Sequence, residues 1–158
     1  MDFKSLKDLE KYLQSKIQES LQTDVANDVK ELLKEHVKTD VYDQYSPTLY
    51  IRREEDGGLL DDSNYLIEPI KDGVSITNVT TDNGYSEDYF GDNSSDPNTW
   101  LVPILEYGVG YNWTRSKIYK MQPYPRPFVE NTRKDLLSGL GKKYMKDALQ
   151  KRGLNVEG

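Results

Sequence analysis

The chain has 158 residues, of which 35% are hydrophobic and 30% are charged, and its formal net charge is −6. This length favours a single domain with one core, and the 12 tyrosines argue against a disordered chain, because disordered segments are poor in aromatic residues. The absence of cysteine excludes disulfides, thiolate metal sites and a cysteine nucleophile. No signal peptide and no run of about 18 apolar residues is found, so we expect synthesis in the cytoplasm and no membrane partner.

Residues 1–45 are predicted to form one long helix or two. Apolar residues recur on one helical face at Leu6, Leu9, Leu13, Ile17 and Leu21. At Thr23 and Asp24 the pattern restarts on a new face, with a side-chain oxygen at a position typical of a helix cap. The region is therefore a pair of helices or a kinked continuation of the first one.

Residues 46–120 are predicted to contain a small antiparallel sheet. Pro47 ends the helical region, because the residue before a proline is disfavoured in helices. Two runs rich in β-formers, 65–70 and 74–80, flank Lys71-Asp72-Gly73, in which Asp-Gly is a strong hairpin signal. The run 48–51 is also rich in β-formers, so we expect three or more strands.

A long acidic loop is expected over 81–99. Its aromatic side chains, Tyr85, Tyr89 and Phe90, favour a loop that docks on a partner. The apolar run 100–105 that follows predicts either a strand or a short helix, since Pro103 cannot donate in a sheet.

The last predicted element is a helix over 125–152 that packs on the sheet. It has proline near its start and Gly153 just past its end, which is the usual asymmetry of helix termini. Gly139 and Gly141 inside it each cost about 1 kcal/mol relative to alanine, so we expect them to mark a bend or a close helix contact. The chain is thus predicted to be a single α+β domain over 1–158.

Charge is distributed unevenly. The stretch Glu54–Asp96 has twelve acidic residues and one basic residue, whereas Arg115–Arg152 has eleven basic residues and three acidic ones. The two stretches can pair inside one chain. Alternatively, the acidic face of one subunit binds the basic face of the next, and such a contact closes into a ring if the rotation permits.

The sequence offers little for catalysis, and we predict no enzyme, no catalytic residue, no metal site and no cofactor. His36 is the only histidine and has no evident partner, so a structural role is favoured over general-base catalysis. Asp92, Ser94, Asp96 and Asn98 alternate as in a calcium loop, but prolines replace the glycine and the glutamate that such a loop needs. The acidic net charge argues against sequence-independent binding of nucleic acid, and no sequence-specific binding is expected.

Four short segments stand out along the chain: Tyr50-Ile51-Arg52-Arg53, Gly57-Gly58-Leu59-Leu60-Asp61, Leu105-Glu106-Tyr107-Gly108 and Pro125-Arg126-Pro127-Phe128. In this order they resemble the tail-completion or head-tail joining proteins in the neck of long-tailed bacteriophages. In such proteins a helix leads into a small antiparallel sheet, and a Glu-aromatic-Gly element precedes a Pro-x-Phe helix start. The resemblance covers about residues 25–150, and the chain departs from it by its long N-terminal helix and its acidic loop.

The resemblance implies a virion structural protein that assembles in the host cytoplasm into a homo-oligomeric ring, with a hexamer favoured. Its partners would be other neck and tail proteins, and packaged DNA would pass through the lumen. The interface residues that we expect are Glu106, Tyr107, Gly108, Arg126, Pro127 and Phe128, together with Tyr85, Tyr89 and Phe90. Among these, Phe128 is expected to be a buried anchor, and Glu106 and Arg126 are expected to be interface or loop-fixing charges.

Two other classes of function stay open at this point. The abundant carboxylates allow a calcium-dependent or carboxylate-based enzyme, although the single histidine and the absence of cysteine argue against it. The acidic stretch also allows a regulator that binds a basic protein, although the basic C-terminal region argues against that function.

Overall fold

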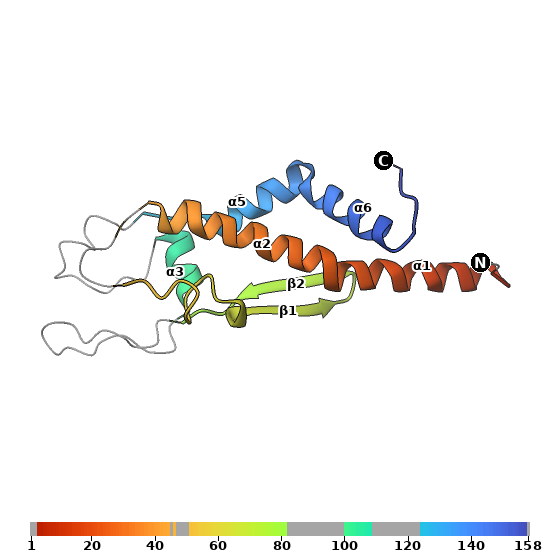
Figure 1. Ribbon diagram of the computed structural model, residues 1–158, viewed down its shortest axis with the longest axis horizontal. Coiled ribbons are helices and arrows are strands. Elements are labelled where there is room, and N and C mark those ends of the chain that lie inside the picture. The colour runs from red at the N-terminus through yellow and green to blue at the C-terminus, as the bar shows by residue number, and fades with distance from the viewer. Residues whose placement is uncertain (1–2, 45, 47–50, 82–99, 109–123, 158) are drawn as a thin grey trace, which may run out of the picture. The chain divides into compact units, whose positions relative to one another are not determined.

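The computed structural model of the chain describes residues 3–44, 46, 51–81, 100–108 and 124–157 (Figure 1). It confirms an α+β protein with a long N-terminal helix, a two-stranded antiparallel sheet and a C-terminal helix. The chain forms two compact units. Unit 1 comprises the described residues of Met1–Leu32, Ile67–Ile76 and Thr132–Gly158, and unit 2 comprises those of Leu33–Leu66 and Thr77–Asn131. That these units form a single domain stays a prediction.

A nearly continuous helical run occupies the predicted N-terminal region (Figure 1). It consists of α1 (Leu6–Ser20), a π-helical segment (Leu21–Val25), α2 (Ala26–His36) and a second π-helical segment (Val37–Tyr42). The hydroxyl of Ser5 caps the start of α1 by accepting a hydrogen bond from the backbone N–H of Asp8 at 3.2 Å. The region is therefore a continuation of one helix, which is the second of the two predicted forms.

The predicted helix cap at Thr23 is wrong. Its hydroxyl donates to the carbonyl of Glu19 at 2.8 Å, and the hydroxyl of Ser20 donates to the carbonyl of Lys16 at 2.8 Å. Hydroxyl groups that bond back to the preceding turn let a helix continue and often bend it. Because a π-helical turn holds about one residue more than an α-helical turn, the segment Leu21–Val25 rotates the apolar stripe to a new face without ending the helix.

The predicted hairpin is confirmed by β1 (Tyr65–Ile70) and β2 (Gly73–Asn78). The turn consists of Lys71 and Asp72, and none of the positive φ angles of the described chain falls on Lys71, Asp72 or Gly73. Glycine is common at the residue that follows the two central residues of a type I turn. The hairpin therefore forms where we predicted it, but Gly73 opens β2 instead of supplying a left-handed turn residue.

A third strand is not present among the described residues. They contain only one further antiparallel bridge, between Thr81 and Trp100. The indole N–H of Trp100 also donates to the carbonyl of Asn78, the last residue of β2, at 2.7 Å. The other predicted strand, Thr48–Ile51, falls almost entirely outside the described residues.

Buried polar contacts in unit 2 fasten the loop that precedes β1. The carbonyl of Leu59 accepts hydrogen bonds from the Tyr65 hydroxyl at 2.7 Å and from the Asn78 amide at 3.0 Å. The carbonyl of Gly58 accepts another from the amide of Asn64 at 2.8 Å. Buried carbonyl groups destabilise a fold unless they are hydrogen-bonded, so these side chains fix the path of the loop.

The remaining α-helices lie in the regions 100–108 and 124–157, for which the sequence made two predictions. The apolar run that predicted a strand or a helix forms α3 (Leu101–Tyr107). The C-terminal region forms α5 (Phe128–Asp135), a π-helical segment (Leu136–Leu140) and α6 (Gly141–Lys151). Gly139 has a φ of 129° and a ψ of −14°, which are not helical values, so the helix is kinked there. The predicted bend is therefore confirmed, at a conformation that favours glycine.

Within unit 1, α6 packs chiefly against α1 and the π-helical segment Leu21–Val25, whereas we predicted that it packs on the sheet (Figure 1). Ala148 and Leu149 on α6 are buried. At the end of α6, Arg152 donates to the carboxylate of Asp24. Since α1 and α6 are both amphipathic, their apolar stripes do not determine whether α6 packs on the sheet or on α1. The contacts of Ala148, Leu149 and Arg152 determine it.

Asp24 makes the stability of unit 1 depend on pH. Hydrogen bonds from Arg152 and then from Lys151 lower the pKa of this carboxyl from 3.8 to about 2. Because the folded pKa lies below the unfolded one, the ionised carboxylate stabilises the fold fully above about pH 4, and this contribution is lost as the pH falls from 4 to 2. We expect Asp24→Asn to lower the melting temperature at pH 7, by a difference that shrinks below pH 4.

Circular dichroism during thermal unfolding at pH 7, 5, 4 and 3 measures this difference. Asp28→Asn is the matched control, because the carboxylate of Asp28 has no hydrogen bond or ion pair within the described chain. Equal losses for the two variants at every pH would contradict the prediction.

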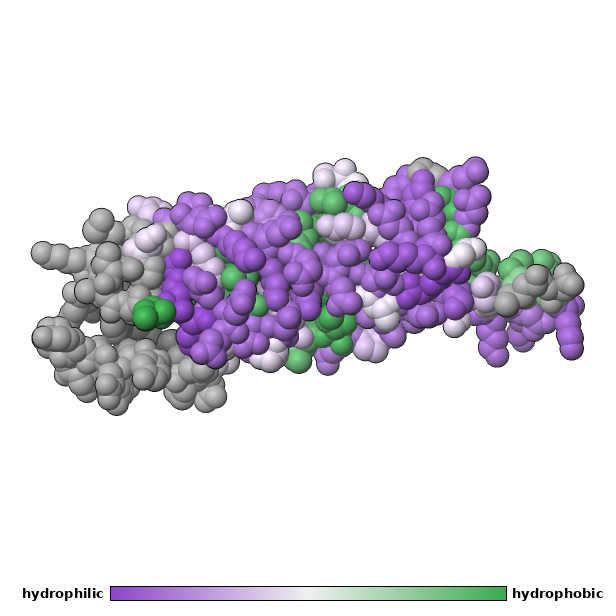
Figure 2. Space-filling model, in the orientation of Figure 1, coloured by the Kyte–Doolittle hydropathy of each residue, from purple (hydrophilic) through white to green (hydrophobic). Residues whose placement is uncertain are grey.

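The molecular face shown in Figure 2 is mostly hydrophilic, with apolar residues in small separate areas. The most exposed apolar side chains, such as Leu6, Ile51 and Leu137, belong to different elements. Single exposed apolar residues are normal on a protein surface. In the described part of the chain, no helix has the length and apolar composition needed to cross a membrane.

Candidate functional site

The junction between α3 and α5, in unit 2, depends on a helix cap from a distant part of the chain. Pro127, which precedes α5, has no side-chain oxygen for the unpaired backbone N–H groups of the first helical turn. The carboxylate of Glu106 accepts these hydrogen bonds instead, from Val129 at Oε2 and from Glu130 at Oε1, both at 3.0 Å. Its negative charge also lies at the positive end of the helix dipole. Because Glu106 is only 7% exposed, both bonds are shielded from water and hold α3 to α5.

Other groups complete this junction. The backbone N–H of Arg126 donates to the carbonyl of Leu105 at 2.8 Å. Gly108 ends α3 in a left-handed conformation, with a φ of 63°, where glycine is favoured. Phe128 is completely buried, whereas Tyr107 is 66% exposed. The junction therefore combines a buried aromatic ring that belongs to the fold with an exposed one that is accessible to a partner.

The structure brings together all the described members of the predicted interface, which are Glu106, Tyr107, Gly108, Arg126, Pro127 and Phe128. The carboxylate of Glu106 and the ring of Phe128 are used inside the fold. Tyr85, Tyr89 and Phe90, the predicted docking aromatics, lie outside the described residues. The role of this whole set as an interface stays a prediction.

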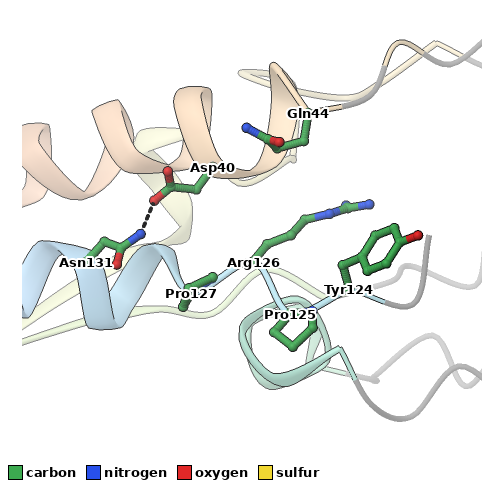
Figure 3. Close-up of a pocket in the computed structure, with 7 residues that line it drawn as sticks. All are labelled: Asp40, Gln44, Tyr124, Pro125, Arg126, Pro127 and Asn131. Atoms are coloured by element: carbon green, nitrogen blue, oxygen red, sulfur yellow. Dashed lines mark hydrogen bonds between the residues drawn. The ribbon is translucent and has the colours of Figure 1, made fainter.

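An open pocket adjoins the junction in unit 2 (Figure 3). Its lining consists of Asp40, Gln44, Tyr124, Pro125, Arg126, Pro127 and Asn131. The amide of Asn131 donates to Asp40 Oδ2 at 3.0 Å, which links the end of the N-terminal helix to α5. The side chain of Arg126 extends between Gln44 and Tyr124, away from Asp40 (Figure 3). An arginine and a tyrosine at the mouth of a polar pocket suit protein recognition, because both residue types are enriched at interfaces.

The prediction that His36 has no partner is wrong. Its Nδ1 atom lies 3.0 Å from Asp40 Oδ2, the oxygen that also accepts from Asn131. Side chains four residues apart on a helix are neighbours, so the spacing of His36 and Asp40 is a signal that the sequence contains. Asn131 has no such signal, because it is 91 residues from Asp40 along the chain.

No group of three or more histidine and carboxylate side chains among the described residues could hold a metal ion. The calcium-like pattern Asp92–Asn98 lies outside the described residues. We assign no catalytic or cofactor-binding role to any residue, and the absence of enzymatic activity stays a prediction.

Comparison with known proteins extends over nearly the whole chain. The model of the YomN family matches residues 5–152, which include the junction between α3 and α5. The curated SPbeta prophage-derived uncharacterized protein YomN of Bacillus subtilis (strain 168) is 28% identical over 122 residues, which cover 77% of this chain and 73% of that protein. No solved structure matches the chain. With this family match and a prophage relative, the chain belongs to the YomN family and is phage-derived.

Proposed function

We propose that this chain is a structural protein of the phage virion that completes the tail or joins it to the head. It assembles in the host cytoplasm as a homo-oligomeric ring, with a hexamer favoured, and it resides in the neck. Its partners are other neck and tail proteins. It acts through protein-protein contacts, without a reaction or a cofactor.

One observation carries the proposal: the two C-terminal motifs of the neck-protein resemblance are bonded to each other. Glu106 belongs to the Glu-Tyr-Gly motif, and its carboxylate caps the helix that Phe128 begins in the Pro-Arg-Pro-Phe motif. These bonds join residues 23 and 24 positions apart. The two motifs thus have a physical reason to occur together, which supports the resemblance, and the phage origin of the family agrees with it.

The exposed side of the junction suits a docking role. The side chains of Tyr107 and Tyr124 are 66% and 62% exposed. Arg126 and Tyr124 both line the pocket beside the junction. Aromatic residues and arginine contribute most of the binding energy at many protein interfaces. Glu106 caps α5, and the backbone N–H of Arg126 donates to the carbonyl of Leu105, so the backbone around Tyr107 and Arg126 is ordered before binding and less conformational entropy would be lost there.

Deletion of the gene from its phage or prophage tests the proposal. Negative-stain electron microscopy of the lysate would count joined particles, free heads and free tails. We expect DNA-filled free heads beside free tails, and the tail lengths distinguish joining from termination. Complementation with the wild-type gene should restore joined particles. Infectious particles in normal numbers after the deletion would contradict a neck role.

A further inference from the structure

Three exposed carboxylates form a turn in unit 2, between the Arg52-Arg53 pair and the loop that precedes β1. We call Glu54, Glu55 and Asp56 the acidic turn, and each of these residues is exposed. None of the three carboxylates makes a hydrogen bond or an ion pair within the described residues. The neighbouring Arg53 directs Nη2 to the carbonyl of Thr81 at 2.7 Å and makes no ion pair with the turn among the described residues.

The acidic turn has a fixed and unusual conformation. Glu54 has a φ of 42°, and it is the one described residue other than glycine with a positive φ. Its carbonyl accepts a hydrogen bond from the backbone N–H of Leu60 at 3.0 Å, and a Cβ on Gly58 would lie 2.5 Å from the same oxygen. Strained conformations outside glycine persist where the surroundings enforce them, and they concentrate at functional sites. The turn is therefore held in place before any partner binds.

Three lysines lie within about one turn of α6 in unit 1. We call Lys142, Lys143 and Lys146 the basic face; Lys142 and Lys143 are exposed, and Lys146 is half-buried. None of these ammonium groups makes a hydrogen bond or an ion pair within the described chain. Lys142 and Lys143 lie in the first turn of α6, where positive charge opposes the helix dipole. Local helix stability thus does not account for them.

We propose that the acidic turn of one subunit binds the basic face of α6 in a second copy of this chain. This inference rests on the proposed function, because it specifies the contact that builds the ring. The three carboxylates of the acidic turn and the three lysines of the basic face are opposite in sign and equal in number, and the two surfaces come from different parts of the chain. A contact between two different surfaces is heterologous, so it propagates from copy to copy and closes into a ring when the rotation permits.

A second copy fits the basic face better than nucleic acid does. The chain carries a net charge of −6, so a phosphate backbone is repelled by most of the protein. A second copy has the same net charge of −6, but this is small beside the charge of a DNA duplex, which has about one negative charge per 1.7 Å of its axis. Interactions between exposed charges are screened by salt, so the contact is expected to weaken as the ionic strength rises.

Charge reversal tests the contact. One variant carries Lys142→Glu, Lys143→Glu and Lys146→Glu, a second carries Glu54→Lys, Glu55→Lys and Asp56→Lys, and a third combines all six changes. The matched control carries Lys4→Glu, Lys7→Glu and Lys11→Glu, which reverse three exposed lysines near the start of the chain. Circular dichroism verifies folding, and sedimentation velocity at 50 and 500 mM NaCl measures self-association of the full chain. If the second variant does not fold, Glu54→Gln, Glu55→Gln and Asp56→Asn replace it.

We expect each single-surface reversal to weaken self-association about tenfold or more at low salt. An equimolar mixture of the two variants, and the combined variant, should recover association, whereas the control should behave as the wild type. A wild-type chain that stays monomeric at high concentration and low salt would overturn the proposal. So would a control that weakens association as much as the basic-face variant does.

Two further outcomes separate this contact from its alternatives. If reversal of the basic face removes binding to a 30-base-pair DNA duplex and leaves self-association unchanged, the face binds nucleic acid and the proposal is wrong. If deletion of the gene leaves normal particles while charge reversal still controls self-association, the neck role fails and the contact stands. Free heads and tails after the deletion, with self-association indifferent to both reversals, would keep the neck role and reject the contact.

Discussion

Phe128→Ala is expected to lower the free energy of unfolding by about 4 kcal/mol. Phe128 is completely buried at the first position of α5. Its truncation removes the transfer free energy of the ring and leaves a cavity that the surroundings fill only in part. A loss of this size is a large fraction of the stability of an ordinary domain, so the variant should also yield less soluble protein. Urea denaturation followed by circular dichroism measures the effect.

Val129→Ala is the matched control for this prediction. Val129 is the next residue of the same helix and is 40% exposed, so its truncation should cost less than about 1 kcal/mol. Phe128→Leu keeps most of the apolar volume and should cost clearly less than Phe128→Ala. If Phe128→Ala is as stable as the wild type but fails to assemble, the aromatic side chain of Phe128 acts at an interface between subunits. If both stability and assembly are normal, neither role is correct.

Glu106→Ala is expected to lower the free energy of unfolding by about 3 kcal/mol. The change leaves the backbone N–H groups of Val129 and Glu130 without their acceptor and removes the negative charge from the start of α5. Unpaired buried donors are costly, and hydrogen bonds to charged groups are stronger than neutral ones. Amide hydrogen exchange measured by NMR should show the earliest loss of protection in the first turn of α5.

Glu106→Gln distinguishes the contribution of the size of the capping side chain from that of its charge and its second acceptor oxygen. Glutamine has the same size but keeps only one acceptor oxygen, and its NH₂ group would face the second backbone donor. Its cost should therefore lie between that of Glu106→Ala and that of Tyr107→Ala, which alters an exposed neighbour on α3 and should change stability by less than about 1 kcal/mol. A wild-type melting temperature for Glu106→Ala would show that the cap contributes nothing to the fold.

Local patterns in the sequence were sufficient for the N-terminal and C-terminal helices and for the hairpin, whereas they left α3 open between a strand and a helix. The apolar spacing from Leu6 to Leu21 predicts a helix because it follows the helical period, and the structure forms that helix. The turn at Lys71-Asp72 was also predicted, and the bend at Gly139 was one of the two predicted alternatives, because turn residues and helix-breaking glycines act through their own backbone conformation. These features depend on residues that lie within a few positions of each other.

Predictions from local patterns were wrong where a residue or a helix face is compatible with two different structures. The hydroxyl of Thr23 can accept from an N–H group as a cap or donate to a carbonyl inside a helix, and in the structure it donates to Glu19. In the same way, an apolar stripe on α6 can cover a sheet or another helix. Its main contacts are with α1 and the segment Leu21–Val25, and the hydrogen bond from Arg152 to Asp24 lies at this contact.

The sequence by itself determined the α+β class, the order of the terminal helices and the hairpin, and the short motifs around Glu106 and Phe128. Each of these is set by periodicity, turn chemistry or residue type over a short stretch of chain. Only the tertiary structure decided what the motifs do, because the cap from Glu106 to α5 and the bond from Asn131 to Asp40 join residues 23 and 91 positions apart. Hydrogen bonds over such separations depend on how the chain folds back on itself, which no local pattern encodes.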